Sequence, residues 1–497
     1  MWRFHVFNHS LRLNFSRLSV LLAASAALAQ SPPAGPNVVL IIADDLGYAE
    51  TGCYGQKKIR TPHIDRLAAE GLRFTQFYSG SPVCAPTRCT LMTGQHTGHA
   101  EIRANREIQP EGQHPISAGA ITLAEALQAR GYATAGIGKW GLGPPGSHGA
   151  PEKQGFDLFF GYNCQRAAHN YYPTYLWEND RKIPLNNPEF PSRQEFPADA
   201  DPNDPAAYQR YRGNEYAPDL MVARGLEFIR ANRERPFFLY VALPIPHMAL
   251  QVPEDSLKEY AGAFPETPYL GGKGYLPHRT PRAAYAAMVS RLDRYVGQIV
   301  GLLQELQLEE RTLVLFTSDN GPTHNGGTDS AFFNSTGPLR GLKGSVYEGG
   351  VRVPLIARWP GRITAGKVTE HVAAMWDMLP TLCEITGAET PPGIDGISFA
   401  PTLLGKGGQK EHEYLYWEYP GGGGQQAVRV GNFKAVRQNL LRGQKRTELY
   451  NLENDVGEQH DIAADHPEVV KRMERIMREA RRPSAVFEFA PLDKEAS

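Results

Sequence analysis

Short apolar runs rich in β-branched residues alternate with longer segments whose apolar residues recur at helical spacing, and this alternation constrains the fold most. Runs that are apolar throughout suit strands buried on both faces, and their alternation with helices is typical of βαβ units. We therefore expect an α/β protein in which helices cover both faces of a large, mainly parallel sheet. The expected strands are residues 37–43, 132–138, 237–243, 312–318 and 353–357, and the expected helices are residues 64–72, 123–129, 220–231, 284–306 and 376–385.

The pattern changes after residue 405. Four short runs and then a charged amphipathic segment predict a smaller antiparallel sheet with one helix. A chain of 497 residues exceeds what one hydrophobic core usually holds, so we expect a large α/β domain over residues 30–405 and a C-terminal α+β subdomain over residues 406–497. The short runs are residues 414–419, 426–430, 434–437 and 448–452, and the helical segment is 467–481.

The first residues have the pattern of a secretory signal peptide. Arginines precede an apolar stretch at residues 18–28, and the small-residue motif Ala27-Leu28-Ala29 predicts removal of residues 1–29. We expect an exported protein, periplasmic or secreted. The stretch is too short to span a bilayer and no later run reaches about 20 apolar residues, so we expect no stable membrane anchor. Lysine plus arginine (52) nearly balances aspartate plus glutamate (53), which leaves no overall field to attract nucleic acid.

The run Cys84-Ala85-Pro86-Thr87-Arg88 has the features of a nucleophile site. Pro86 suits the first turn of a helix, so Cys84 is expected at the helix N-terminus, where unpaired N–H groups favour negative charge. Arg88 lies four residues further on and shares the helix face of Cys84. Considered alone, a buried or disulfide-bonded cysteine beside a chance arginine is the simpler interpretation.

Paired oxygen ligands follow two of the expected strands. Asp44-Asp45 comes after the run at 37–43, and Asp319-Asn320 after the run at 312–318. Ligands of open parallel sheets bind beyond the carboxyl ends of the strands. Carboxylates and an amide with no thiol or imidazole beside them in the sequence favour Ca²⁺ or Mg²⁺ over zinc. Each pair alone has a structural alternative, since Asp-Asp often caps a helix and Asn-Gly often forms a hairpin turn.

Cations follow other expected strands. Lys139 ends one strand, His247 follows another, and Lys343 lies in the glycine-rich stretch 340–344. Single lysines and histidines are usually surface or structural groups. A cluster of cations beside a metal is, however, what an anionic tetrahedral substrate requires.

In these segments the sequence strongly resembles the type I sulfatases of the alkaline-phosphatase-like superfamily, over nearly the whole expected mature chain. The run at 84–88 matches their Cys-x-Pro-Ser/Thr-Arg signature, which is very specific, and Leu91-Met92-Thr93-Gly94 continues it. The other segments that match family motifs, in the same order, are Asp44-Asp45, Gly138-Lys139-Trp140, Pro246-His247, Asp319-Asn320-Gly321, residues 349–354 and residues 448–452.

The resemblance implies that a formylglycine-generating maturation enzyme oxidises Cys84 to formylglycine, whose hydrate carries two hydroxyl groups on one carbon. One hydroxyl attacks the sulfur of a sulfate ester and displaces the alcohol, and loss of the second proton then expels sulfate. The resemblance also implies Ca²⁺ as the cofactor, in preference to Mg²⁺. Its implied ligands are Asp44, Asp45, Cys84, Asp319 and Asn320.

The resemblance further implies roles for the cations. Arg88 holds the diol and balances charge, and Lys139 and Lys343 bind sulfate oxygens. Lys343 together with His247 assists the leaving oxygen or a proton transfer.

One departure concerns proton transfer. Many family members have a histidine two residues after the lysine, but here that position is Gly141. We expect His169, or alternatively His148, to take over part of that role. The alternative is that His169 only lines the substrate pocket.

Substrate specificity is expected to come from loops and from the smaller subdomain. Arg103 is a candidate to pair with a second sulfate or a carboxylate of the substrate, and the further candidates are Asn105, Tyr171, Tyr172, Trp177, His324 and Trp417. The leading hypothesis is an exported, calcium-dependent, arylsulfatase-like enzyme that hydrolyses sulfate esters of a glycan or of a smaller aryl or alkyl alcohol. The alternatives are a phosphodiesterase or phosphonate monoester hydrolase on the same scaffold, and a non-catalytic protein that binds sulfated polysaccharide.

Overall fold

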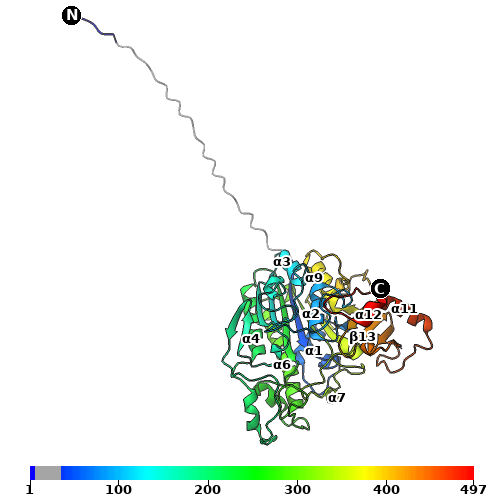
Figure 1. Ribbon diagram of the computed structural model, residues 1–497. Coiled ribbons are helices and arrows are strands. Elements are labelled where there is room, and N and C mark those ends of the chain that lie inside the picture. Colours follow the sequence, from blue (N-terminus) through cyan, green and yellow to red (C-terminus); the bar gives the residue numbers. More distant parts are fainter. Residues whose placement is uncertain (6–34, 497) are drawn as a thin grey trace. The chain divides into compact units, whose positions relative to one another are not determined.

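The computed structural model describes residues 1–5 and 35–496 (Figure 1). The expected signal peptide therefore lies almost wholly outside the described residues. Among the residues that are described, none of the helices combines the length and the apolar character needed to cross a bilayer.

Within the described part of the chain, a large mixed sheet of 11 strands forms the centre of the fold (Figure 1). Its strand order is β10-β2-β9-β8-β1-β7-β3-β4-β5-β6, and β11 pairs with β2 at one edge. The strands are β1 (Asn37–Asp44), β2 (Leu72–Tyr78), β3 (Ala133–Lys139), β4 (Leu158–Tyr162), β5 (Tyr175–Glu178), β6 (Arg181–Pro184), β7 (Phe237–Pro246), β8 (Thr312–Ser318), β9 (Arg352–Arg358), β10 (Lys367–Thr369) and β11 (Ala373–Ala374).

The central strands β8, β1, β7, β3 and β4 run parallel to one another, so their carboxyl ends meet at one edge of the sheet. Strand β1 is buried along its whole length, and its side chains alternate between two hydrophobic cores. Val39, Ile41 and Ala43 join one core, whereas Val38, Leu40 and Ile42 join the other. This period of two explains why the run is apolar throughout.

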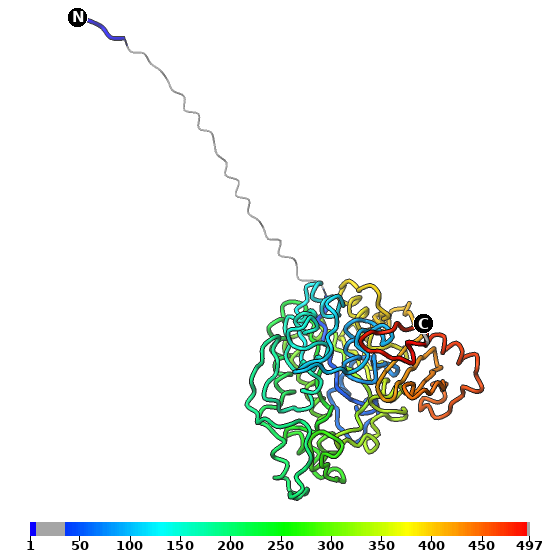
Figure 2. Tube along the Cα trace, viewed as in Figure 1, coloured from blue at the N-terminus to red at the C-terminus, as the bar shows by residue number. Residues whose placement is uncertain are grey.

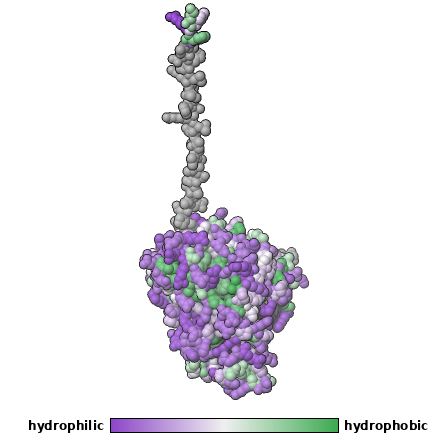
Figure 3. Space-filling model, turned by 90° about the vertical axis from the view of Figure 1, so that its left-hand side faces the viewer, coloured by the Kyte–Doolittle hydropathy of each residue, from purple (hydrophilic) through white to green (hydrophobic). Residues whose placement is uncertain are grey.

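Helices cover both faces of the large sheet. The first core contains residues of α1 (Pro62–Ala69), α4 (Ala217–Ala231) and α6 (Pro281–Glu305), and the second contains residues of α2 (Cys84–Thr93), α3 (Leu123–Ala129) and α9 (Met378–Thr386). The shorter helices are α5 (Glu254–Leu257), α7 (Ser330–Phe333), α8 (Glu348–Val351), α10 (Ala400–Leu403) and α12 (Ala490–Ala496). Figure 3 shows a mostly hydrophilic surface on one face, with a hydrophobic area in its upper part.

The smaller antiparallel sheet consists of β12 (Leu415–Tyr419), β13 (Gln425–Val430), β14 (Phe433–Arg437) and β15 (Thr447–Asn451). One face of it packs against α11 (Pro467–Glu479), and the other packs against residues of the large part such as Tyr78 and Trp376. The C-terminal residues then return beside the segment that follows α2 (Figure 2). There the N–H of Arg482 donates to the carbonyl of Gly98. Residues 35–496 belong to one compact unit, and the domain boundary expected at residue 405 stays a prediction.

The expected fold class is confirmed, and most expected elements lie within a few residues of the observed ones. One expectation was wrong: the helix at 64–72 ends at Ala69, and Leu72 instead begins β2. Gly71 separates the two elements, and β2 alternates buried Leu72 and Phe74 with partly exposed residues, which is the period of a strand. Strand β9 was expected, but it runs antiparallel to both neighbours, β2 and β8.

Candidate active site

Four neighbouring strands place the predicted functional residues at one edge of the sheet. Along the order β8-β1-β7-β3, the strand ends are followed or closed by Asp319-Asn320, Asp44-Asp45, His247 and Lys139. A shift in the register between β1 and β7 pairs Asp44 with Pro246, which brings the two aspartates beside the segment that carries His247. The edge of the sheet therefore gathers residues that are far apart in the chain, such as Asp45 and Asn320, which are separated by 275 positions.

Cys84 reaches this edge from the N-terminus of α2, as expected from Pro86. Its side chain is buried, and its Sγ lies 3.5 Å from Nζ of Lys139, 3.6 Å from Nζ of Lys343 and 3.7 Å from Oδ1 of Asp44. Burial raises the pKa of this thiol to about 11, although the two lysines act in the opposite direction. A thiol here is thus uncharged at neutral pH. All five cysteines of the chain are free in the described residues.

Each buried carboxylate has a cation beside it. Lys139 Nζ lies 2.6 Å from Oδ2 of Asp44, and Lys343 Nζ lies 2.7 Å from Oδ1 of Asp45. Arg88, which is fully buried, places Nη2 at 3.3 Å from Asp44 and 3.1 Å from Asp319. Burial opposes ionisation of Asp44, but the lysines, the arginine and His247 hold its pKa well below the usual range. Burial and the nearby charge of Asp44 raise the pKa of Asp319 to about 7.

The donor atoms at this edge fit a hard cation. Oδ1 of Asn320 is buried and has no hydrogen-bond partner among the described residues, while its Nδ2 donates to Oδ1 of Asp45 at 2.7 Å. An unpaired buried carbonyl oxygen beside three carboxylates is an arrangement that Ca²⁺ or Mg²⁺ would satisfy. An imidazole also lies beside these groups in the folded protein, because Nε2 of His247 is 3.6 Å from Oδ2 of Asp45. Candidate ligand atoms of Asp44, Asp45, Cys84 and His247 lie within 4.8 Å of one another.

Two stacked imidazoles lie beside these groups. The rings of His169 and His247 are parallel to within 6°, with centroids 4.8 Å apart. Nδ1 of His247 lies 2.6 Å from the carbonyl oxygen of Met248, and Nδ1 of His169 has no hydrogen-bond partner among the described residues. Burial lowers the pKa of both rings well below the usual range, and the positive charges of Lys139 and Lys343 act in the same direction.

A cavity of about 720 Å³ opens onto Cys84. The predicted site residues that line it are Cys84, Lys139, His169, His247 and Lys343, together with the specificity candidates Asn105 and His324. Further lining residues had no motif to mark them: most lie outside the helices and strands, and Tyr419 ends β12. These include Gln165, Arg166, Arg193, Tyr275 and Tyr419.

Several predicted specificity residues do not line this cavity. Arg103 is a correction: its Nη1 donates to Oε1 of Glu418 and to the carbonyl of Arg482, both at 2.8 Å, so its charge serves the contact with the C-terminal part. Trp417 is buried and donates to the carbonyl of Ser79. Tyr171 is buried with its hydroxyl on backbone carbonyls, and His148 is exposed away from the cavity. Tyr172 and Trp177 line other cavities.

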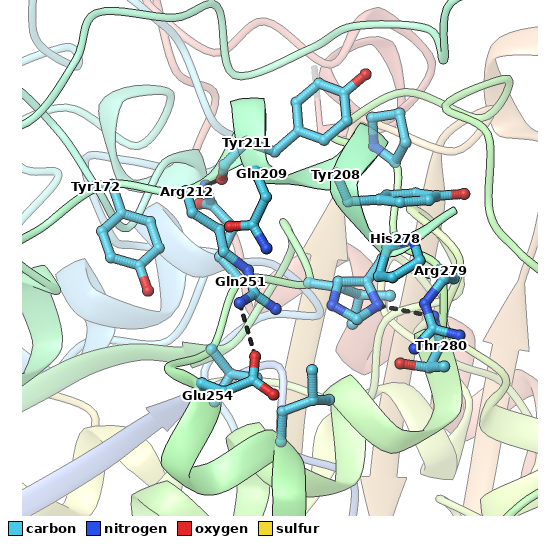
Figure 4. Close-up of a pocket in the computed structure, with 15 residues that line it drawn as sticks. Tyr172, Tyr208, Gln209, Tyr211, Arg212, Gln251, Glu254, His278, Arg279 and Thr280 are labelled. Carbon is cyan, nitrogen blue, oxygen red and sulfur yellow. Dashed lines mark hydrogen bonds and ion pairs between the residues drawn. The ribbon is translucent and has the colours of Figure 1, made fainter. Parts of the chain in front are cut away.

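A second cavity, of about 370 Å³, contains Tyr172 (Figure 4). Figure 4 shows Arg212 in an ion pair with Glu254, and Nη1 and Oε2 of the two residues are 2.7 Å apart. The cavity that opens onto Cys84 has two lysines beside its candidate nucleophile and is therefore the better place for an anion.

Comparison with known proteins agrees with this geometry. Residues 36–388 match the model of the Sulfatase family, and residues 342–483 match the family described as N-sulphoglucosamine sulphohydrolase, C-terminal. The chain belongs to the sulfatase family. This sulfatase is 33% identical to arylsulfatase A of Homo sapiens over 520 residues, which cover 95% of this chain and 92% of that protein.

Two further relatives place the sulfatase in its superfamily. It is 33% identical to N-acetylgalactosamine-6-sulfatase of Canis lupus familiaris over 445 residues, with 84% of this chain and 75% of that protein covered. The crystal structure of Ps i-CgsB in complex with k-i-k-neocarrahexaose superimposes with a TM-score of 0.74 at 27% identity and covers 92% of this chain and 95% of that chain. The protein is a type I sulfatase with the alkaline-phosphatase-like fold, and its activity is that of a sulfuric ester hydrolase.

Proposed function

We propose that this sulfatase is exported and removes sulfate from a sulfated glycan, with a nucleophile formed from Cys84 and a bound Ca²⁺. The observation that carries the proposal is the pair of ammonium groups, Lys139 and Lys343, within 3.6 Å of Cys84 Sγ. An anionic group that approaches residue 84 meets both cations, while the buried carboxylates behind them supply ligands for a metal.

The nucleophile is proposed to be formylglycine, produced from Cys84 by a maturation enzyme. When present, its hydrate supplies a hydroxyl group that attacks sulfur and a second hydroxyl group whose deprotonation releases sulfate. Asp44, Asp45, Asp319 and Asn320, with residue 84, would hold Ca²⁺, which when bound favours the deprotonated form of a hydroxyl group and offsets the charge of sulfate.

Lys139 and Lys343 are proposed to bind sulfate oxygens. Each is held in place by a carboxylate, Asp44 or Asp45, so little reorganisation accompanies substrate binding. Arg88 balances the charge of Asp44 and Asp319. Its guanidinium is fixed by a donation from Nη1 to the carbonyl of Lys139 at 2.6 Å.

His247 is proposed to exchange a proton with the leaving oxygen through Nε2. A carbonyl oxygen only accepts hydrogen bonds, so the contact with Met248 keeps the proton on Nδ1 and leaves Nε2 for the site. His169 stacks on this ring and fixes its orientation. If His169 takes part, His169→Ala will slow sulfate release as Lys139→Ala and His247→Ala do, whereas a wild-type rate would remove it from the mechanism.

A glycan substrate is supported by the cavity and by the relatives. The cavity of about 720 Å³ is large enough for sugar residues and has Arg193 in its wall, where it can meet a further anionic group. One relative is named for N-acetylgalactosamine 6-sulfate, and the Ps i-CgsB structure holds a carrahexaose.

Intact-peptide mass spectrometry combined with sulfate release tests the nucleophile. In active preparations, the side chain of residue 84 is expected to have lost its sulfur atom and to carry an aldehyde. Cys84→Ala is expected to abolish sulfate release. Cys89→Ala is the matched control, because Cys89 lies in the same helix but packs in the core. Full activity with only unmodified thiol at position 84 would contradict the proposal.

Metal dependence and substrate class are tested separately. Removal of metal with a chelator is expected to abolish activity, and Ca²⁺ is expected to restore it better than Mg²⁺. Equal activity in a demonstrably metal-free sample would exclude the cation. A preference for an aryl phosphodiester over an aryl sulfate with the same leaving group would favour the phosphodiesterase alternative.

A further inference from the structure

Gln165 occupies the space into which a side chain at position 141 would project. The N–H of Trp140 donates to the carbonyl of Tyr162 at 2.9 Å, so the loops that follow β3 and β4 leave the sheet side by side. A Cβ added to Gly141 would fall 1.9 Å from Nε2 of Gln165 and 2.8 Å from its Cδ. The carboxamide of Gln165 therefore lies directly against Gly141, two residues beyond Lys139.

The carboxamide of Gln165 is buried without partners. The side chain is 5% exposed, and neither Nε2 nor Oε1 has a hydrogen-bond partner among the described residues. Buried polar groups are almost always paired, and a buried one left unpaired is costly. Gln165 also lines the cavity that opens onto Cys84. The missing partner is therefore best supplied by a molecule bound in that cavity.

The chemistry of a carboxamide restricts that partner. Sulfate oxygens only accept hydrogen bonds, so they would leave the oxygen of Gln165 unpaired, and the lysines beside Cys84 already meet them. A hydroxyl group both donates and accepts, as the carboxamide does. We propose that Gln165 binds substrate by hydrogen bonding a hydroxyl group of the sugar that carries the sulfate ester. This rests on the proposed glycan function and adds a binding position to it.

The test compares two substrates with Gln165→Ala and Gln165→Leu in the mature enzyme. One substrate is 4-nitrophenyl sulfate, whose alcohol has no further hydroxyl group. The other is the best substrate from a panel of galactose 2-, 4- and 6-sulfates and the 6-sulfates of N-acetylgalactosamine and N-acetylglucosamine. Loss of the hydrogen bond is expected to lower kcat/KM about tenfold on the sugar sulfate and to leave the aryl sulfate within about twofold of wild type.

Gln154→Leu is the control variant. Gln154 is also buried with an unpaired carbonyl oxygen, but it does not line the cavity. Its replacement is expected to change thermal stability without changing the ratio of the kcat/KM values for the two substrates. Gln165→Leu nearly preserves volume, so the contact with Gly141 and the fold are expected to survive.

The outcomes separate this inference from the proposed function. Equal losses on both substrates, or no loss on either, would overturn the role of Gln165 while the sulfatase function stands. Cleavage of the aryl sulfate by wild type with no cleavage of any sugar sulfate in the panel would also overturn it. Failure of aldehyde-containing wild type to hydrolyse any sulfate ester would instead refute the proposed function.

Discussion

Arg88 and Asp319 form a fully buried ion pair, with Nη2 of the arginine 3.1 Å from Oδ2 of the aspartate. The same nitrogen lies 3.3 Å from Asp44, so one guanidinium balances two carboxylates that come from different strands. Removal of one partner from a buried ion pair leaves the other charge uncompensated.

Arg88→Ala is therefore expected to lower the free energy of unfolding by about 3–5 kcal/mol, measured by urea denaturation. Added Ca²⁺ is expected to recover part of the loss, because a cation that binds only the folded protein stabilises it. The control is Arg181→Ala, since Arg181 is exposed and its ion pair with Glu178 contributes at most about 1 kcal/mol. Similar effects of the two substitutions would contradict the prediction.

Gly141→Ala tests the contact with Gln165. Gly141 has a φ of +85°, so alanine there is strained by about 1 kcal/mol, and overlap with Gln165 adds about 1–3 kcal/mol. The matched control is Gly146→Ala, because Gly146 has a φ of +77° and a Cβ there meets nothing within 4 Å. In a Gln165→Ser background, Gly141→Ala is expected to cost no more than Gly146→Ala. If Gly141→Ala lowers the free energy of unfolding as much in this background as in wild type, the side chain of Gln165 is not what blocks a Cβ at position 141.

Glu50 is expected to make stability depend on pH. Its carboxyl accepts from the N–H of Gly47 and from the hydroxyl of Tyr285, and burial raises its pKa from 4.5 to about 7. The folded state thus holds the proton more tightly than the unfolded chain does. Its contribution is fully present below pH 4.5 and is lost as pH rises through about 7.

Glu50→Gln mimics the protonated carboxyl and removes this dependence. Between pH 5 and pH 8, the free energy of unfolding of wild type is expected to fall relative to that of the variant by up to about 3 kcal/mol. Urea denaturation at both pH values measures the difference. Parallel pH profiles for the two proteins would be the contrary result.

Lys434 joins the small sheet to the large part of the protein. Its Nζ is fully buried, 2.8 Å from Oε1 of Glu348 and 3.1 Å from Oε1 of Glu458. Lys434→Met is expected to lower the free energy of unfolding by about 3–5 kcal/mol, since Glu458 loses its cation and Glu348 is left with its ion pair to Arg352. The control Lys471→Met removes an exposed pair with Glu468 and is expected to change stability by less than about 0.5 kcal/mol. Comparable unfolding midpoints for the two variants would refute this assignment.

The elements that the sequence predicted well depend on local interactions. Residues 312–318 and 123–129 coincide with β8 and α3, because the spacing of apolar side chains along a strand or a helix can be recognised from neighbouring residues alone. Cys84 begins α2 because Pro86 suits a first turn. The strand β2 was missed because Leu72 continues the apolar spacing of α1, and only pairing with β9 shows that it belongs to a strand.

The kinds of groups at the candidate site were predicted from the sequence, but not all of the residues that lie there. His247 and Asp45 are 3.6 Å apart only because β1 and β7 are neighbours. Arg103 was assigned to the substrate because an arginine in a loop is usually free to bind an anion, and Glu418, 315 residues away, takes it instead. Gln165 had no motif, and its importance depends on the glycine that it covers.

The sequence by itself thus determined the fold class, the strands and helices with a clear periodic pattern, and the kinds of groups that follow those strands, because these depend on backbone sterics and on residue chemistry. The tertiary structure alone decided the order β8-β1-β7-β3, the direction of β9 and the partners of His247, Arg103 and Gln165. The physical reason is that these contacts join residues far apart in the chain, and they form only when both cores pack around one sheet.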